Sequence, residues 1–434
     1  MNKKVQTVKG MQDMLPDDLA KIEHIESLFF KTAERYGFIR VQTPIVEFAE
    51  LYSSTCEFPE ERCYSLNDSK GRKLVLRSDP DAPLARLVTD NFRYAPKPIK
   101  LAFCGSIFRS WNHRRREFRM FSLNTFGLDE SAADVEILRV IADVIESVGF
   151  PGYRVEFNNL QFFRRIISAS GIEPLSPDKV GDILYSIRFA PDSESIIKTL
   201  ISRHVSRNTI DAILELLECH DDESRIHDVV VRLSGTIPSL LLEFEKTMAF
   251  KMALTDLGMR HSKLNVANLH GTGFYSGLTY RLFPKNGSRE IGDGGRYDHM
   301  VQQMNNEPMP ATGIGLGIER FVELMEVNGC PIKLPPKARS VIVSYADASL
   351  ASRCRPTLQQ LRLAGCIVEE DLANRGFDKT VRYARSKRYN RAVLVNTSES
   401  KKGFHLRVVN LDDESGDSVV ISTLEELYNI MLKC

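Results

Sequence analysis

The sequence has few features of a secreted, membrane-spanning or metal-binding protein. Its eight cysteines are scattered and form no CxxC pair, which argues against a disulfide framework and against a zinc site with the usual ligand spacing. Its longest apolar runs, such as residues 238–244, are far shorter than the roughly 20 residues that cross a bilayer. Residues 1–4 (MNKK) lead into polar sequence rather than the apolar core of a signal peptide. We therefore expect a cytoplasmic protein with no metal site and no membrane partner.

An excess of charge of one sign is also missing. Lys and Arg number 58 and Asp and Glu number 57, so the formal net charge of +1 produces no overall attraction to nucleic acid. Any contact with nucleic acid must come from a local basic patch. The length of 434 residues and the hydrophobic fraction of 43% predict a packed chain of about three domains.

Hydrophobic periodicity divides the chain into sheet-rich and helix-rich stretches. It predicts a helix over residues 17–36 and strands near 37–44, 73–77, 99–103 and 118–126, the last two antiparallel. Strand signals nearly vanish from 160 to 262 and return at 271–283 and 290–298. A glycine- and proline-rich linker over 328–337 precedes alternating strands and helices. We predict an α+β protein: a catalytic core (1–159 and 263–327) with an antiparallel sheet flanked by helices, a helical insertion (160–262) and a C-terminal α/β domain (338–434).

Arginines concentrate in one predicted hairpin. Arg109 follows a predicted strand, and an arginine-rich loop leads from it to the next strand at Phe118. Guanidinium groups are rigid forked donors that match phosphate oxygens, so the hairpin is a candidate clamp for a polyphosphate or an RNA backbone. A solvated basic turn is the alternative.

Two glycine-rich segments follow later in the chain. The glycines of residues 311–320 (ATGIGLGIER) allow a close approach to the backbone, and Arg320 lies one turn into a predicted helix. Residues 292–298 (GDGGRYD) predict a sharp turn beside Arg296 and Asp298. Tight strand-to-helix packing and a structural Arg–Asp pair are the alternative interpretations.

In this order the segments resemble class II aminoacyl-tRNA synthetases, specifically the histidyl-tRNA synthetase family. Residues 9–16 (KGMQDMLP) resemble the family's opening segment, and residues 36–44 (YGFIRVQTP) resemble motif 1, which implies a homodimer. Residues 108–121 are similar to motif 2 and residues 315–320 to motif 3. The resemblance implies that Arg109 and Arg320 are the catalytic arginines, which bind the α- and γ-phosphates of ATP. It implies further ATP-binding roles for Arg116 and Glu319, with Mg²⁺ accompanying the nucleotide.

Two further segments resemble the family's amino-acid site. Residues 76–86 (LRSDPDAPLAR) are similar to LRPEGTAPVAR, and residues 274–277 (FYSG) and 294–298 (GGRYD) are similar to the paired segments RGLDYYTG and GGRYD. The C-terminal domain resembles the family's anticodon-binding domain, which implies L-histidine and tRNA, specifically the histidine tRNA, as partners. The implied amino-acid-binding residues are Asp79, Asp81, Asn124, Asp129, His270, Tyr275, Gly294, Gly295, Arg296 and Tyr297.

Several positions depart from the family pattern. His270 stands where the arginine of RGLDYYTG assists histidine activation, and Asp81 replaces the threonine of LRPEGT. Trp111 stands where motif 2 carries the glutamate of FRxE. An imidazole replaces a guanidinium only when it is protonated, and an ordinary pKa near ~6.5 leaves it mostly neutral at pH 7. A key cation is therefore expected to be missing.

Three functions follow from these patterns. The first is a ligase that activates histidine with ATP and transfers it to tRNA. The second is a catalytically degenerate relative that senses histidine as the regulatory subunit of ATP phosphoribosyltransferase and binds the catalytic subunit of that enzyme. The third is a synthetase-like ligase for another amino acid. The retained Arg109 and Arg320 and the C-terminal domain favour the first.

Overall fold

A computed structural model describes residues 6–53, 63–110, 115–169, 177–397, 403–412 and 417–432. Trp111 and the loop around it lie outside these ranges. The chain divides into two compact units, Met1–Leu334 and Pro335–Cys434, with the boundary inside the predicted linker. No helix in the described ranges is long and apolar enough to cross a bilayer.

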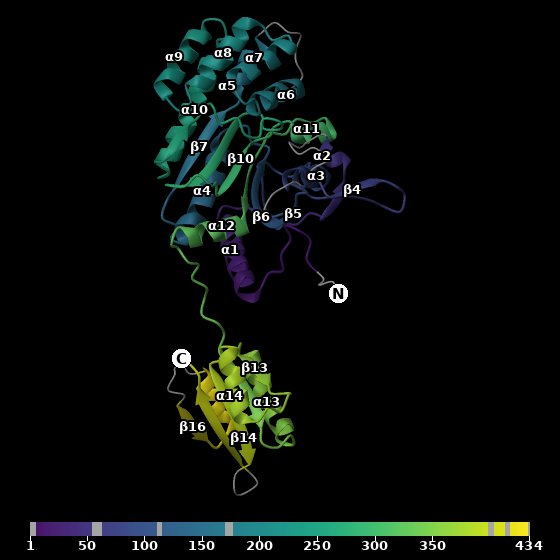
Figure 1. The fold of residues 1–434 in the computed structure, drawn as a ribbon, viewed down its shortest axis with the longest axis vertical. Helices are drawn as coiled ribbons and strands as arrows, with labels where there is room; N and C mark the ends of the chain where they lie inside the picture. The colour runs from purple at the N-terminus through teal and green to yellow at the C-terminus, as the bar shows by residue number, and fades with distance from the viewer. Residues whose placement is uncertain are drawn as a thin grey trace. The chain divides into compact units, whose positions relative to one another are not determined.

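The first unit is built on an eight-stranded sheet (Figure 1). The interior strands pair antiparallel, which includes the pair predicted at 99–103 and 118–126, whereas the two edge strands pair parallel with their neighbours. In spatial order the strands are β1 (Ile39–Val41), β5 (Ile99–Phe108), β6 (Glu117–Phe126), β11 (Ala311–Gly317), β10 (Gly292–Arg296), β9 (Leu278–Pro284), β7 (Tyr153–Asn159) and β8 (Ser262–Leu264). Segments far apart in sequence thus meet at the centre, where β6 pairs with β11.

Three helices cover one face of this sheet: α1 (Pro16–Arg35), α4 (Ala132–Ser147) and α12 (Ile318–Val327). The apolar spacing of α1 buries Ile22, Ile25 and Phe29, and the Phe29 ring stacks on Phe121 of β6 with a centroid distance of 4.4 Å. Aromatic pairs of this kind add to the burial energy of the rings themselves. The packing anchors α1 on the sheet and leaves the opposite face for other contacts.

Shorter elements complete the core of the first unit. A three-stranded sheet of β2 (Val46–Phe48), β4 (Lys73–Leu76) and β3 (Ser65–Asn67) holds the strand predicted at 73–77, which therefore does not join the large sheet. Helix α3 (Asp81–Asn91) packs between α2 (Glu50–Ser53) and α11 (Met300–Asn305). Residues 271–277, predicted as strand, form turns, because Gly271 adopts a left-handed φ of +63°.

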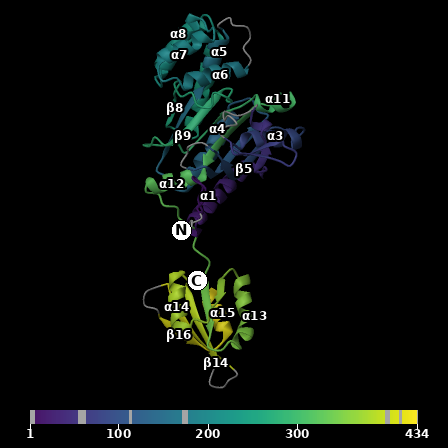
Figure 2. The same ribbon diagram turned by 45° about the vertical axis from the view of Figure 1, so that its right-hand side comes forward.

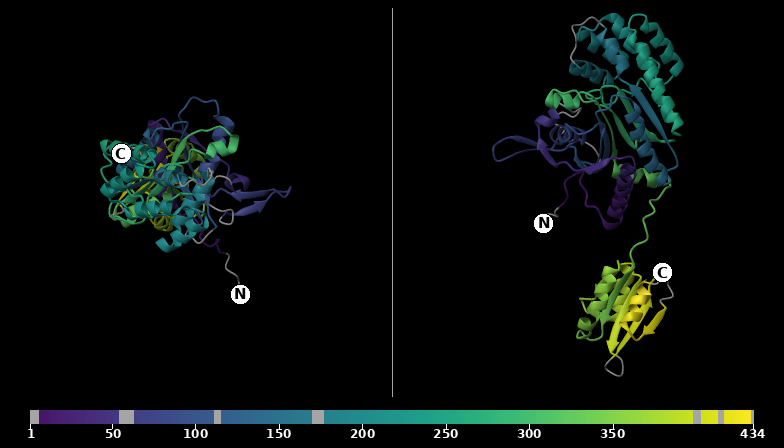
Figure 3. Two further views of the ribbon diagram at one scale, coloured as in Figure 1. Left: turned by 90° about the horizontal axis from the view of Figure 1, so that it is seen from above. Right: turned by 180° about the vertical axis from the view of Figure 1, so that it is seen from behind.

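Between β7 and β8, where strand signals vanish in the sequence, the described residues form six helices. Most of them gather at one end of the sheet (Figure 3), and the last of them also packs on β7, β8 and α4. Asp192, Ser206 and Asp222 cap three of them by accepting hydrogen bonds from backbone N–H groups of the first turn. The helices are α5 (Gln161–Ser168), α6 (Pro177–Arg188), α7 (Ser193–Ser202), α8 (Arg207–Glu218), α9 (Glu223–Ser234) and α10 (Ser239–Asp256).

The second unit is a five-stranded mixed sheet with helices on both faces (Figure 2). Strand β12 pairs parallel with β13 and β14, as βαβ connections require, and β15 and β16 add antiparallel strands. The elements are β12 (Ser340–Tyr345), α13 (Leu350–Leu363), β13 (Ile367–Glu370), α14 (Phe377–Ser386), β14 (Arg391–Thr397), β15 (Phe404–Asn410), β16 (Ser418–Ile421) and α15 (Leu424–Leu432).

Candidate functional site

The register of the large sheet determines which side chains share a face. Asp293 of β10 is paired with Arg281 of β9 and with Gly315 of β11, and Gly315 is paired with Ser122 of β6. Directly paired residues project to the same face of a sheet. Arg281, Asp293 and Ser122 therefore define one face, which we call the site face, opposite the face that α1, α4 and α12 cover.

A strip of glycines runs through the middle of the site face. On β11, a Cβ atom at Gly313 would lie 2.1 Å from Asn124 Oδ1, whereas at Gly315 its nearest neighbour would be Met120 Sδ at 3.1 Å. At Gly317 no heavy atom would lie closer than 3.6 Å. The strip is therefore closed at one end and bare at the other, where a flat ligand can approach the backbone.

The two arginines singled out in the sequence flank this strip from neighbouring elements. Arg109 directly follows β5, donates from Nε to the Ser78 carbonyl at 3.0 Å, and lies over the Phe118 ring. Arg320 lies in the first turn of α12 and donates from Nη1 to Glu290 Oε1 at 2.8 Å. Both guanidinium groups act on Asp293, because each lowers the pKa of that carboxyl against the effect of burial. Arg109 and Arg320 therefore both lie within electrostatic range of the Asp293 carboxyl on the site face.

Glu290 is a residue of this site that the sequence did not reveal. Its carboxylate accepts from Arg320 through one oxygen and from Arg281 Nε (3.0 Å) and Nη2 (2.5 Å) through the other. Burial alone would raise the pKa of Glu290, but the two guanidinium groups outweigh burial and hold it below its ordinary range. The carboxylate therefore fixes the positions of two cations, and only the pairing of β9 with β10 brings Arg281 to it.

Three aspartates converge beside Arg109. Asp79 Oδ1 accepts the backbone N–H of Asp81 at 2.7 Å, and Asp79 Oδ2 lies 4.0 Å from Arg109 Nη2. Burial raises the pKa of all three carboxyls: for Asp293 to about 7, with Glu290 adding to the shift, and for Asp81 well above its ordinary value, with repulsion from Asp79 and Asp293 adding to it. Asp293 lies within the segment GDGGRYD, but the sequence alone gave it no role. The three carboxyls therefore retain their protons to a higher pH than an exposed aspartate does.

Buried polar and aromatic side chains lie next to the aspartates. The Tyr297 hydroxyl donates to Asn124 Oδ1, and Asn124 Nδ2 donates to Ser122 Oγ at 2.8 Å. Tyr275 lies against Gly295, where a Cβ atom would be 3.0 Å from the Tyr275 ring. The structure therefore groups the predicted residues Asn124, Tyr275, Gly295 and Tyr297 on the site face.

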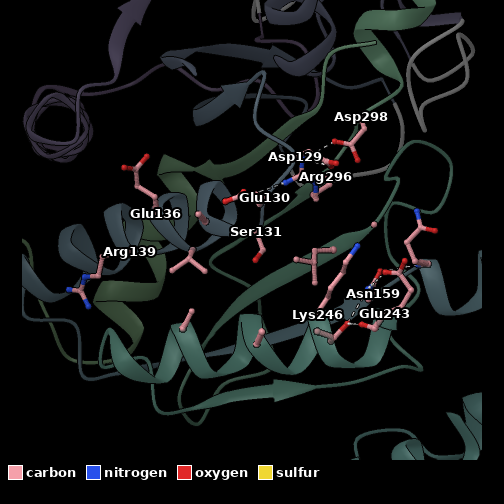
Figure 4. Close-up of a pocket in the computed structure, with 18 of the residues that line it drawn as sticks. Asp129, Glu130, Ser131, Glu136, Arg139, Asn159, Glu243, Lys246, Arg296 and Asp298 are labelled. Carbon is pink, nitrogen blue, oxygen red and sulfur yellow. Dashed lines mark hydrogen bonds and ion pairs between the residues drawn. The ribbon is translucent and has the colours of Figure 1, made fainter. Parts of the chain in front are cut away.

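Arg296 and Asp129, two of the predicted amino-acid-binding residues, lie apart from this group. Successive side chains of β10 point to opposite faces of the sheet, and Arg296 points to the face opposite the site face. There it donates to Asp134 Oδ2 at 2.9 Å and to Asp298 Oδ1 at 3.1 Å. Asp129 is exposed, 3.7 Å from Arg296. Both line an open cavity of about 1080 Å³ that also borders α4 and α10 (Figure 4). Gly294 faces the same way, towards Tyr280. The geometry places Arg296 in ion pairs with Asp134 and Asp298.

Arg116 and Glu319, for which the resemblance predicts contacts with ATP, make contacts within the protein. The Glu319 carboxylate accepts the backbone N–H of Arg119 through both oxygens at 3.0 Å, which joins α12 to β6, and burial raises its pKa. Arg116 donates its backbone N–H to the Gly10 carbonyl at 2.7 Å, and its side chain packs over Gly10. These contacts hold the opening segment and the motif-3 helix in place.

His270 is buried and neutral in this structure. Burial, with smaller effects from Arg281 and Arg188, lowers the pKa of its imidazole to about 3. Its ring meets Tyr275 edge-to-face with centroids 5.6 Å apart. A neutral imidazole does not replace the cation that the sequence comparison expects at this position.

Comparisons with known proteins agree with this architecture. The family model described as histidyl-tRNA synthetase matches residues 10–321. The histidine–tRNA ligase of Pyrococcus abyssi is 26% identical over 98% of this chain and 100% of that protein. The ATP phosphoribosyltransferase regulatory subunit of Ruminiclostridium cellulolyticum is 25% identical over 96% of this chain and 98% of that protein.

Solved structures share the fold. The crystal structure of histidyl-tRNA synthetase from Nostoc superposes with a TM-score of 0.73 at 19% identity and covers 99% of both chains. At this identity the likeness establishes the α+β fold, while the family model extends over well over half of the chain. The chain therefore belongs to the histidyl-tRNA synthetase family.

Proposed function

We propose that the protein is an ATP-dependent ligase that activates histidine as its adenylate and transfers it to tRNA. The observation that carries the proposal is the pair Arg109 and Arg320, held by the Ser78 carbonyl and by Glu290 beside a glycine strip of the site face. The strip offers backbone to a flat base. The two cations match the negative charge of a triphosphate.

In the first step, a carboxylate oxygen of the amino acid attacks the α-phosphorus of ATP, and the bond from that phosphorus to the bridging oxygen of pyrophosphate breaks. In the second, a terminal hydroxyl of tRNA takes the acyl group and AMP leaves. The protein contributes alignment and charge neutralisation, with Arg109 at the α-phosphate and Arg320 at the γ-phosphate. Glu290 keeps Arg320 in place between substrate-binding events.

Mg²⁺ enters this proposal with the nucleotide. Among the described residues, no group of three or more His, Cys, Asp or Glu side chains is arranged to hold a metal ion. We therefore assign the ion to the phosphate oxygens of ATP, which bind it without a dedicated protein cage and where it adds positive charge.

The amino-acid end of the site is acidic. In this proposal Asp79, which lies 4.0 Å from Arg109, accepts the α-ammonium group of the substrate, and the Asn124–Tyr297 pair contacts its side chain. A substrate with a second positive charge would stabilise the ionised forms of the remaining carboxyls, Asp81 and Asp293, against the effect of burial. This observation supports the alternative that the ligase activates a cationic amino acid other than histidine.

A second candidate function is that of a histidine-sensing regulatory subunit of ATP phosphoribosyltransferase, which would bind the catalytic subunit. Neutral His270 supports it, since the activating cation is missing, and so does the similarity to the regulatory subunit of R. cellulolyticum. Such a protein would bind histidine without forming the adenylate.

Exchange of pyrophosphate into ATP distinguishes these functions. The assay uses purified full-length protein with histidine, lysine, ornithine and arginine in separate reactions. Under our proposal histidine drives exchange, and Arg109→Ala or Arg320→Ala lowers the rate by on the order of a hundredfold. The control Arg93→Ala removes a surface ion pair with Glu307 and leaves the rate unchanged.

Other outcomes assign the alternatives. Exchange only with lysine, ornithine or arginine selects the ligase for a cationic amino acid. Histidine binding by calorimetry without exchange selects the sensor. The absence of both binding and exchange with all four amino acids would refute the proposal.

Partners of the proposed reaction fit two surfaces. Strand β1 is an edge strand of the large sheet and exposes Ile39, which supports a homodimer through motif 1. Light scattering should show a dimer, and Ile39→Lys should weaken it.

In the second unit, α14 and the turn after it expose Lys379, Arg382, Arg385, Lys387 and Arg388. This basic patch suits an RNA backbone, and a tRNA partner places the reaction in the cytoplasm.

A further inference from the structure

Arg77 is an arginine buried beside the candidate ATP site. It directly follows β4 and is only 1% exposed. Burial of a charged group is costly because the charge leaves water, and burial lowers the pKa of this guanidinium group. A hydrophobic side chain often fills such a place at no loss of stability. The hydrogen bonds of Arg77 show what the guanidinium group does that a hydrophobic side chain does not.

The side chain of Arg77 joins two segments that are far apart in the sequence. Its Nη1 donates to the carbonyls of Thr43 at 2.7 Å and Pro44 at 3.4 Å, and its Nε donates to the carbonyl of Ser106 in β5 at 2.8 Å. A guanidinium group is planar and presents its N–H donors in a fixed fork. One side chain therefore sets the distance and the angle between residues 43–44 and β5.

The main chain of Arg77 makes the same connection. Its N–H donates to the Ile45 carbonyl at 2.9 Å, and its carbonyl accepts the N–H of Phe108 at 3.0 Å. The next carbonyl along the chain, that of Ser78, accepts Arg109 Nε at 3.0 Å. The carbonyl that holds Arg109 therefore belongs to the residue directly after Arg77, which is fixed through both its side chain and its main chain.

The guanidinium group of Arg77 packs on the site face of β5. Phe103 is paired with Ser122 and so lies on the site face, as does Gly105 two residues further along. The guanidinium carbon lies 4.8 Å from the centre of the Phe103 ring. A Cβ atom at Gly105 would lie 2.3 Å from Arg77 Nη2, so this close approach requires the glycine.

We propose that Arg77 is a positioning residue for the ATP site: it holds the main chain at Ser78 so that the guanidinium group of Arg109 is directed at the α-phosphate. The inference rests on the proposed contact between Arg109 and ATP. It adds a residue that is too deeply buried to touch the nucleotide itself. Because Arg77 acts through Arg109, its replacement should weaken ATP binding only while Arg109 is present.

A double-mutant cycle on the binding of Mg·ATP tests this coupling. Equilibrium dialysis with radiolabelled ATP, full-length protein and no amino acid measures the affinity. We expect Arg77→Gln to weaken binding by about tenfold in the wild-type chain, because a misaligned charge-assisted hydrogen bond loses strength, and by less than about twofold in the Arg109→Ala chain. Arg77→Lys keeps the charge but loses the fork, and it should show the same pattern if Arg77→Gln fails to fold.

Arg154 provides a matched control. It also donates to backbone carbonyls, those of Pro284 at 2.7 Å and Gly287 at 2.6 Å, and its guanidinium carbon lies 4.6 Å from the centre of the Phe283 ring. It belongs to β7 and has no part in holding Arg109. Arg154→Gln should therefore leave the affinity for ATP unchanged.

Several outcomes would overturn the proposal. Equal weakening by the Arg77 variants with and without Arg109, or equal weakening by Arg154→Gln, would indicate a general structural effect. An unchanged affinity in the Arg77 variants, a wild-type chain that binds no ATP, or failure of both Arg77 variants to fold would also overturn it. Pyrophosphate exchange separates this result from the proposed function. ATP binding with the expected cycle but without exchange refutes the ligase and leaves the role of Arg77 intact, whereas exchange with an additive cycle does the reverse.

Discussion

The buried carboxyl of Asp293 should make the first unit less stable as the pH rises. Its pKa is about 7 in the folded protein against an ordinary value of 3.8. Below pH 4 the group is protonated in the folded and unfolded chains alike, and the two states do not differ. Between about pH 4 and 7 the unfolded chain loses the proton while the folded chain retains it, so folding stability falls. Above pH 7 the penalty is complete.

The size of this loss of folding stability follows from the pKa shift of Asp293. A difference of about three pKa units at 1.36 kcal/mol each corresponds to at most about 4 kcal/mol at pH 8. Asp293→Asn removes the titrating group with little change in shape. We expect it to exceed the wild type by only about 1 kcal/mol near pH 4.5 and by on the order of 2–4 kcal/mol at pH 8.

Urea unfolding at pH 4.5, 6, 7 and 8 measures this difference, with the fluorescence of the single tryptophan, Trp111, as a probe in the first unit. Asp134 also has a raised pKa, about 6, and contributes its own slope to wild type and variant alike. The comparison of the two proteins therefore cancels it. A stability difference that stays constant from pH 4.5 to 8 would refute the reasoning.

Two further predictions concern the packing of the sheet. Arg296→Met should destabilise the first unit by about 3–5 kcal/mol in the same urea assay, because it leaves the buried Asp134 carboxyl without its cation; a loss below about 1 kcal/mol would contradict the structural role of the pair. Gly313→Ala should cost about 1–3 kcal/mol, since the new Cβ would lie 2.1 Å from Asn124 Oδ1. Gly317→Ala, on the open end of the strip, is the matched control and should be near neutral, and equal losses for both variants would contradict the described geometry.

Local pattern predicted much of the architecture. The apolar spacing of residues 17–36 predicts α1, and the alternating aromatics on both sides of the arginine loop predict the antiparallel pair β5–β6. Both depend on periodicity within one segment, which side-chain burial enforces directly. The parallel pairing of the edge strand β1 with β5 was not predicted, because it joins segments about 60 residues apart in the sequence.

Within the candidate site, motifs in the sequence identified the residues, whereas the register of the strands decided which of their side chains share a face. The motifs singled out Arg109 and Arg320, and the structure places both within electrostatic range of Asp293. Arg296 belongs to an equally recognisable segment, yet strand alternation turns it to the opposite face, where Asp134 binds it. A sequence motif identifies a residue but does not show on which face of the sheet its side chain lies.

The sequence by itself determined the family, helix α1, the antiparallel pair β5–β6 and the arginines of the hairpin and the motif-3 helix, because each of these is encoded within one segment or in two neighbouring segments. Only the tertiary structure decided that Arg281 and Glu290 meet Arg320, and that three aspartates share one buried site. It also decided that His270 is neutral. Charge, burial and partner choice depend on groups that approach through space from distant segments, and local sequence carries no record of that approach.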